Sequence, residues 1–249
     1  MDHRTIIEKA SRLLEILALP QGLPLKLRDP SFDTGPLRVC TRLRDAGIAP
    51  ASVFDVGANR GQFALAARTV FPNAQIHSYE PIPATFAELS ELAQRRGGIA
   101  AHNLALGTQA GTQKFTVTSN SVSSSFLPLH ENHLRAYPEI QKSAEIDVQV
   151  STLALQLAEL EPPQPVLLKL DVQGFEAEVL EGAGESLKQV KWIVLETSTR
   201  PLYQGQVLFD ELCARLGKRG FRFAYPMDLH FGHGGGVSQF DALFERSAD

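Results

Sequence analysis

The stretch that decides the fold is residues 53–63, which read Val-Phe-Asp-Val-Gly-Ala-Asn-Arg-Gly-Gln-Phe. An apolar run leads into a turn that contains Gly57 and Gly61, and the alanine-rich run behind it predicts a helix. Glycine lets a ligand approach without a Cβ in the way, and the free N–H groups of a first helical turn are donors. The pattern predicts a strand, a tight turn and a helix that together form the floor of a cofactor site.

A glycine turn after a strand also opens dinucleotide-binding folds, whose spacing is G-x-G-x-x-G. The second glycine position is Asn59 in this chain, and its side chain obstructs the close approach of a pyrophosphate. The pattern D-x-G-x-N-x-G that starts at Asp55 instead resembles the first motif of class I S-adenosylmethionine (SAM) methyltransferases. A nicotinamide-dependent oxidoreductase and a cofactor-free α/β scaffold stay open as alternatives.

Composition and charge narrow the classes of function. The 249 residues are 43% hydrophobic and 21% charged, with a formal net charge of -4 and no basic block, so we expect no nucleic acid partner. The two cysteines, Cys40 and Cys213, lie far apart without metal-ligand spacing, which is typical of reduced thiols. No run reaches the length of a membrane span, and acidic residues interrupt the N-terminus, so we expect a cytoplasmic protein.

The chain divides into an N-terminal helical extension, residues 1–50, and a single domain, residues 51–249. Apolar residues fall on one face of residues 6–17, which predicts an amphipathic helix. This helix is expected to pack on its own domain or to cap the site; a homodimer contact or attachment to a lipid-linked substrate are alternatives. Prolines and glycines in residues 19–36 predict an extended connection, followed by a helix over residues 37–46.

Two strands after the glycine turn carry further candidates. Residues 74–79 predict a strand that ends at Glu80, which lies 19 positions beyond Gly61, so its carboxylate should lie beside the glycine turn. A carboxylate there can accept from both hydroxyls of a ribose; the alternative is a solvated acid at the end of a strand. Residues 99–106 predict the next strand, with Asn103 near its end.

Residues 119–125, the serine loop, form either a short linker or a loop over the active site. His130 and His133 follow three residues apart without a third metal ligand in view. We therefore interpret them as surface histidines.

Residues 166–180 are the second informative stretch. They predict a buried strand that ends at Asp171 and a helix that begins just after Gly174. Central parallel strands are apolar throughout, so Lys169 and Asp171 require an explanation. Asp171 lies at the carboxyl end of its strand, where open α/β sheets bind ligands.

The C-terminal region distinguishes the fold class. Residues 221–225 and 239–245 predict two consecutive strands with no helix between them, so they must pair antiparallel. This ending resembles the methyltransferase sheet more than a dinucleotide-binding fold. The predicted fold is a single doubly wound, mostly parallel, seven-stranded sheet with an antiparallel C-terminal strand pair.

With these pieces in order, the chain resembles the FkbM family of SAM-dependent methyltransferases. The resemblance rests on residues 54–61, 79–81, 103–107, 168–182 and 195–196. It implies O-methylation of a sugar, glycan or natural product, with a small-molecule or glycan acceptor. It also implies that SAM is held by Asp55, Gly57, Asn59, Gly61, Glu80, Asn103 and Ala105. Gln173 stands where family members commonly carry Glu, which weakens any mechanism that needs a carboxylate there.

An alcohol acceptor needs a general base within hydrogen-bond reach. Asp171 is the first candidate and could also contact the cofactor; Glu176 and Glu196 are expected as substrate-side acids, with Lys169 as an ion-pair partner. His230 and His233, in a glycine-rich segment, are a second candidate base. No resident metal is expected, although Asp171 and Glu196 could hold Mg²⁺ in a metal-assisted variant. A non-catalytic binding module on the same fold is the remaining alternative.

Overall fold

The main feature is a seven-stranded sheet with the order β3-β2-β1-β7-β8-β10-β9. The computed structural model describes residues 14, 16, 17, 19, 22–29, 32–136, 139–231 and 235–247. The first five strands of that order run parallel, whereas β10 runs antiparallel to both β8 and β9. The predicted sheet with an antiparallel C-terminal pair is confirmed. Its strands are β1 Ser52–Val56, β2 Gln75–Tyr79, β3 Ile99–His102, β7 Val166–Leu170, β8 Val190–Ser198, β9 Phe221–Phe231 and β10 Val237–Arg246.

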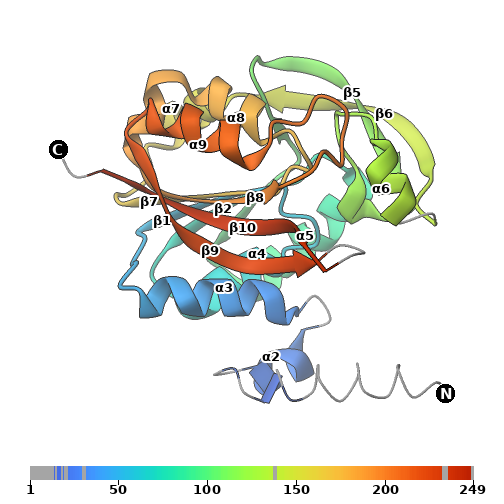
Figure 1. Ribbon diagram of the computed structural model, residues 1–249. Helices are drawn as coiled ribbons and strands as arrows, with labels where there is room; N and C mark the ends of the chain where they lie inside the picture. Colours follow the sequence, from blue (N-terminus) through green and yellow to red (C-terminus); the bar gives the residue numbers. More distant parts are fainter. Residues whose placement is uncertain are drawn as a thin grey trace.

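Helices cover both faces of this sheet (Figure 1). One face carries α3 Thr34–Asp45, α4 Gln62–Val70 and α5 Pro83–Arg96; the other carries α7 Leu153–Leu160, α8 Glu176–Ala183 and α9 Phe209–Gly217. Every residue of β1 and β7 is buried, as expected for central parallel strands between two helical layers. The apolar side chains form two large cores, one on each face.

A second, three-stranded sheet flanks the first and has the order β4-β6-β5. It consists of β4 Ala105–Leu106, β5 Gly111–Thr118 and β6 Lys142–Ser151; the short elements η1 Ser121–Ser123, α6 Glu131–Ala136 and η2 Gly184–Gln189 complete the described chain. The expectation of one strand over residues 99–106 was wrong. The chain leaves the main sheet at Asn103, whose side chain donates to the Glu80 and Pro81 carbonyls, and β4 pairs with β6 instead.

The N-terminal region also differs from the expectation. Residues 22–28, predicted as extended, form the helix α2 Gly22–Arg28, because Pro24 lies in its first turn, where a missing N–H breaks no helical bond. Helix α3 begins before residue 37 because the Asp33 side chain caps it, accepting from the Gly35 N–H at 3.0 Å. The predicted amphipathic helix over residues 6–17 lies almost entirely outside the described residues.

Helix α3 packs as part of the same body as the sheet. Its buried side chains, Leu37, Val39, Cys40 and Leu43, share a core with β1 and α4. Arg38 forms an ion pair with Asp228 of β9 at 3.1 Å, and this joins α3 to the sheet edge. Within the ranges that the structure describes, no helix has both the length and the apolar character needed to cross a bilayer.

Candidate active site

A cavity of about 610 Å³ opens at the carboxyl ends of β1, β2, β7 and β8. This volume is typical of small-molecule sites, which span roughly 300–1,000 Å³. The position is the one at which open α/β sheets bind ligands, because the loops after parallel strands meet there. The cavity is lined by residues of the glycine turn, the serine loop, the end of β7 and the facing parts of β8, β9 and β10.

Gly57 is glycine for a reason that the sequence did not show. Its φ is +82°, and a Cβ there would overlap the backbone carbonyl of Asp171. The N–H groups of Gly57 and Ala58 donate to the Tyr79 carbonyl at 3.0 and 2.9 Å, so they are already used within the protein. The glycine therefore allows the turn after β1 to approach the end of β7, and this approach brings Asp171 to the cavity.

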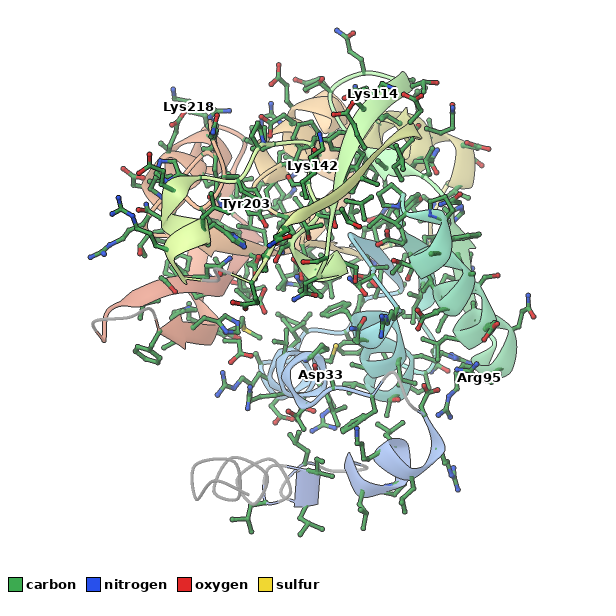
Figure 2. The ribbon with its side chains drawn as sticks, turned by 90° about the vertical axis from the view of Figure 1, so that its right-hand side faces the viewer. Asp33, Arg95, Lys114, Lys142, Tyr203 and Lys218 are labelled. Carbon is green, nitrogen blue, oxygen red and sulfur yellow. The ribbon has the colours of Figure 1, made fainter. Side chains whose placement is uncertain are left out.

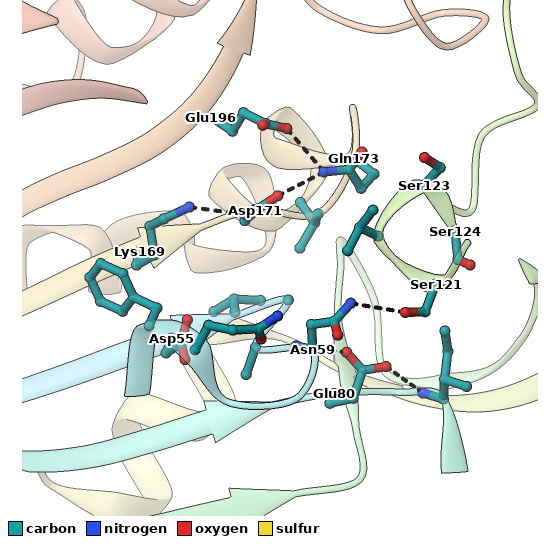
Figure 3. Close-up of a pocket in the computed structure, with 18 of the residues that line it drawn as sticks. Asp55, Asn59, Glu80, Ser121, Ser123, Ser124, Lys169, Asp171, Gln173 and Glu196 are labelled. Carbon is teal, nitrogen blue, oxygen red and sulfur yellow. Dashed lines mark hydrogen bonds and ion pairs between the residues drawn. The ribbon is translucent and has the colours of Figure 1, made fainter. Parts of the chain in front are cut away.

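Gly61 and Asn59 differ in what they face. Gly61 has a φ of +87°, and a Cβ would meet the Leu89 and Leu92 side chains of α5; it allows helix packing and is not among the cavity-lining residues. Asn59, with a φ of +48°, lines the cavity, and its Nδ2 donates to Ser121 Oγ at 3.3 Å. Asn59 thus connects the glycine turn to the serine loop (Figure 3).

Glu80 lies beside the glycine turn, as its spacing predicts. Its Oε2 accepts from the Asn59 N–H at 3.0 Å, and its Oε1 accepts from the Ile82 N–H at 2.8 Å. The residue is 4% exposed and lines the cavity, so the solvated-acid alternative is wrong. Burial raises the pKa of Glu80 to about 7, although the hydrogen bonds from the two backbone N–H groups act to lower it. Ala105 also lines the cavity, between Leu104 and Leu106, whereas the Asn103 side chain is engaged with backbone carbonyls.

A cluster of charged side chains around the buried Lys169 occupies the other end of the cavity. Lys169 Nζ lies 3.4 Å from Asp171 Oδ2 and 3.5 Å from Asp241 Oδ1, so the predicted Lys169–Asp171 ion pair is confirmed. Burial acts to lower the Lys169 pKa, but the surrounding carboxylates outweigh it and raise that pKa above its ordinary value. Asp55 is 1% exposed, and burial raises its pKa to about 7.

Sequence reasoning missed Asp241. It lies on β10 directly opposite Glu196 of β8, and both residues line the cavity. Asp241 is the one acid among the apolar residues at the centre of its strand. The same signal that singled out Lys169 and Asp171 would have identified it.

Gln173 connects two of the three acids predicted for catalysis, Asp171 and Glu196. Its Nε2 donates to Asp171 Oδ1 at 2.8 Å and to Glu196 Oε2 at 3.0 Å (Figure 3). Its Oε1 accepts from the Tyr203 hydroxyl at 2.7 Å, and Tyr203 is a second residue that sequence reasoning missed. A neutral amide at this position therefore joins two carboxyl groups that a third acid would repel.

Glu176 and the histidines do not all lie where the sequence analysis expected them. Glu176 is buried away from the cavity, and its Oε1 accepts from the Val172 and Gly174 N–H groups, so it stabilises the loop after β7 instead of facing a substrate. His230 lines the cavity from β9, and His233 lies outside the described residues. The expectation of a surface position for His133 was wrong: it is 4% exposed and packs against the Tyr203 ring, with 5.4 Å between centroids.

The serine loop lies over the cavity. Asn120, Ser121, Val122, Ser123 and Ser124 line it, and Ser125 Oγ donates to the Gln173 carbonyl at 2.8 Å. The linker interpretation was therefore wrong, and the interpretation as a loop over an active site stays a prediction.

The donor set between Asp171 and Glu196 does not suit Mg²⁺. The Gln173 amide donates to both carboxyl groups, and the Lys169 ammonium faces Asp171 from the other side. A hard cation prefers oxygen ligands, not N–H donors. In the part of the chain that the structure describes, no three His, Cys, Asp or Glu side chains gather as a metal site.

The family model for the methyltransferase FkbM domain matches residues 55–223, which is more than half of the chain. This chain belongs to the FkbM family of methyltransferases. The FkbM match begins at Asp55 of the glycine turn and ends before β10, so Asp241 lies outside the matched region.

Three curated methyltransferases are similar to this chain in sequence. The 31-O-demethyl-FK506 methyltransferase FkbM of Streptomyces tacrolimicus is 26% identical over 89% of this chain and 94% of its own length. Methyltransferase sdnD of Sordaria araneosa is 30% identical over 58% of this chain and 65% of sdnD. The 2-O-methyltransferase NoeI of Sinorhizobium fredii is 26% identical over 62% of this chain and 66% of NoeI. The chain thus spans slightly less than two thirds of sdnD and NoeI.

Solved methyltransferase structures are more distant. A SAM-dependent methyltransferase from Aquifex aeolicus is similar with a TM-score of 0.46 and 12% identity, over 89% of this chain and 96% of that one.

Proposed function

We propose that this FkbM-family chain is a SAM-dependent O-methyltransferase that acts on a hydroxyl group of a sugar, a glycan or a natural product. The observation that carries the proposal is the charge of the cavity. Eight acidic residues line it, namely Asp33, Asp55, Glu80, Glu139, Asp171, Glu196, Asp228 and Asp241, against one lysine or arginine among the described lining residues, Lys169. Other basic residues, such as Arg95, Lys114 and Lys218, lie at the periphery of the molecule (Figure 2).

This charge distinguishes between the two cofactor classes. SAM carries a sulfonium and an ammonium group, which an acidic cavity attracts, whereas the pyrophosphate of a nicotinamide dinucleotide carries two negative charges, which it repels. Lys169, the one lysine or arginine among the described lining residues, is already paired with Asp171 and Asp241. The acidic lining therefore supports SAM and disfavours the oxidoreductase.

The residues at the glycine-turn end fit the parts of SAM. Glu80 has both oxygen atoms anchored by backbone N–H donors, and each oxygen has further capacity to accept from a ribose hydroxyl. Leu104, Ala105 and Leu106 supply an apolar wall suited to an adenine ring. Asp55 offers a buried carboxyl group suited to the ammonium of the methionine part.

When bound, SAM supplies a methyl group on a sulfonium, which is an electrophile. The protein must then align an acceptor hydroxyl and remove its proton, since an alcohol is too weakly acidic to ionise at neutral pH. The acids at the end of β7 and on β8 and β10 are our candidates for accepting the proton, since they line the same cavity as the serine loop. The names of NoeI and FkbM, both O-methyltransferases, support an oxygen acceptor.

Calorimetric titration with S-adenosylhomocysteine and, separately, with NAD⁺ tests the cofactor. We expect S-adenosylhomocysteine to bind and NAD⁺ not to bind. Glu80→Ala should weaken binding tenfold or more, because a hydrogen bond to a charged group contributes about 1.5–3 kcal/mol. Glu91→Ala, which changes an exposed acid on α5, is the matched control and should bind as the wild type does.

Two outcomes would contradict the proposal. Binding of NAD⁺ alone would indicate an oxidoreductase. Binding of neither ligand would support the non-catalytic module. If S-adenosylhomocysteine binds, transfer of labelled methyl groups from SAM to a panel of saccharides and hydroxylated natural products identifies the acceptor.

A further inference from the structure

The acids of the charged cluster differ in how many of their oxygen atoms are already engaged. Both Asp171 oxygen atoms are engaged, since Oδ1 accepts from Gln173 at 2.8 Å and Oδ2 faces the Lys169 ammonium at 3.4 Å. Asp241 has one engaged oxygen atom, Oδ1, which lies 3.5 Å from Lys169 Nζ, so its charge is directly paired with a cation. Glu196 Oε2 accepts from Gln173 at 3.0 Å, whereas Oε1 forms no hydrogen bond or ion pair with any described residue. Glu196 lines the cavity and therefore presents an open oxygen without a directly paired cation.

The Gln173 amide determines which Glu196 oxygen stays open. Both of its N–H donors are used, one on each acid. Its orientation is fixed because Oε1 accepts from the Tyr203 hydroxyl at 2.7 Å. Its backbone has a φ of +56°, and Ser125 Oγ donates to its carbonyl at 2.8 Å. With Oε2 held by this rigid amide, Oε1 is the Glu196 oxygen left for an acceptor (Figure 3).

We propose that Glu196, not Asp171, is the general base of the methyl transfer and that Gln173 is the residue that positions it. This inference rests on the proposed function. The acceptor hydroxyl gives its proton to Glu196 Oε1 while its oxygen forms the new bond to the methyl carbon. The electron pair of the broken sulfur–carbon bond stays on sulfur, which becomes a neutral thioether, and the proton later leaves Glu196 for solvent.

The electrostatic environment suits this role. Burial raises the pKa of Glu196 well above its ordinary range, and the neighbouring Asp171 carboxylate adds to the effect. A base is most effective when its pKa lies near the working pH, which a carboxyl group reaches only when its ionised form is disfavoured. The charged and titratable groups around Glu196 are Lys169 of β7, Asp171 directly after β7, Asp241 of β10, Glu176 of α8 and Tyr203.

Carbon-13 NMR of glutamate side-chain carboxyl groups tests the assignment without an acceptor. The full chain is titrated with and without S-adenosylhomocysteine, and Glu196→Gln identifies the Glu196 signal. We expect Glu196 to titrate well above the ordinary glutamate value of about 4.3. Gln173→Glu replaces the donor by an acid of the same shape and should move the Glu196 midpoint further upward. Gln149→Glu makes the same change at an exposed position on β6, 3.0 Å from Thr112, and should leave it unmoved.

A Glu196 midpoint at the ordinary value, or one that Gln173→Glu leaves unchanged, would overturn the proposal. Once an acceptor is identified, turnover gives an independent comparison. Glu196→Gln should lower kcat at least about a hundredfold with little change in S-adenosylhomocysteine affinity, and Asp171→Asn and Asp241→Asn should each lower it less. A larger loss for either aspartate would transfer the role to that residue. Failure to bind S-adenosylhomocysteine would contradict the proposed function instead, and the titration of the ligand-free protein would still test the Glu196–Gln173 coupling.

Discussion

Gly57→Ala is expected to be the most destabilising glycine substitution in the glycine turn. The added Cβ would lie 2.7 Å from the Asp171 carbonyl carbon and would overlap the carbonyl oxygen. That backbone has little freedom to move, because the Asp171 N–H donates to the Val56 carbonyl at 3.0 Å. The substitution therefore forces the ends of β1 and β7 apart.

Substitutions at two other glycines give reference values for the expected loss of stability. Gly47 has a φ of +80° and no atom within 4 Å of its Cβ position, so Gly47→Ala carries only the left-handed backbone cost of about 1–2 kcal/mol. Gly61→Ala adds overpacking against the Leu89 and Leu92 side chains, which costs about 1–3 kcal/mol more. Side-chain carbons can shift, whereas the Asp171 backbone cannot do so without breaking its strand pairing. Gly57→Ala should therefore cost more than Gly61→Ala, for which the two terms together give about 2–5 kcal/mol.

Urea unfolding of the three variants and the wild type measures these differences. The expected order of lost stability is Gly57→Ala, then Gly61→Ala, then Gly47→Ala. Gly57→Ala should also weaken S-adenosylhomocysteine binding, because it displaces Asp171 at the cavity. If Gly57→Ala proved no more destabilising than Gly47→Ala, the close approach of the turn to β7 would not be the reason for glycine at position 57.

Three further predictions concern the cavity. Lys169→Met should lower the free energy of unfolding by at least about 1 kcal/mol, because it removes the cation that pairs with Asp171 and Asp241. Burial raises the pKa of Asp241, so urea unfolding should show a smaller loss at acidic pH, where a protonated Asp241 needs no cation. Asn59→Gly removes the 3.3 Å hydrogen bond to Ser121 of the serine loop. Amide hydrogen exchange in residues 120–125 should therefore become faster, while global stability changes little. Unchanged exchange would show that this hydrogen bond does not hold the loop. Burial raises the pKa of Glu80 from 4.5 to about 7, so the folded state keeps a proton that the unfolded chain releases. The wild type should therefore lose stability relative to Glu80→Gln as the pH rises from 4.5 to about 7, and a constant difference across that range would contradict the buried assignment.

Local sequence patterns predicted most of the fold. Apolar runs of strand length, the glycine turn at Gly57 and the antiparallel ending each depend on residues close together in the chain, so the sequence alone predicted the sheet. The sequence-based prediction failed where one local pattern is compatible with two different structures. Pro24 breaks a helix interior but is tolerated in a first turn, so the proline-rich segment contained α2. Asn103 turns the chain out of the main sheet only because the Glu80 and Pro81 carbonyls lie within reach.

The candidate site also has features that the sequence predicted and features that it did not. The sequence by itself determined that Asp55, Glu80 and Asp171 follow or end strands of one sheet, because the carboxyl ends of parallel strands meet at one edge. Only the tertiary structure placed Asp241 opposite Glu196, joined Gln173 to Tyr203 and turned Glu176 away from the cavity. These contacts join residues 4 to 45 positions apart whose side-chain directions depend on strand register and loop conformation. Register and packing are properties of the folded chain, and they determine which of several acids keeps an oxygen open to a substrate.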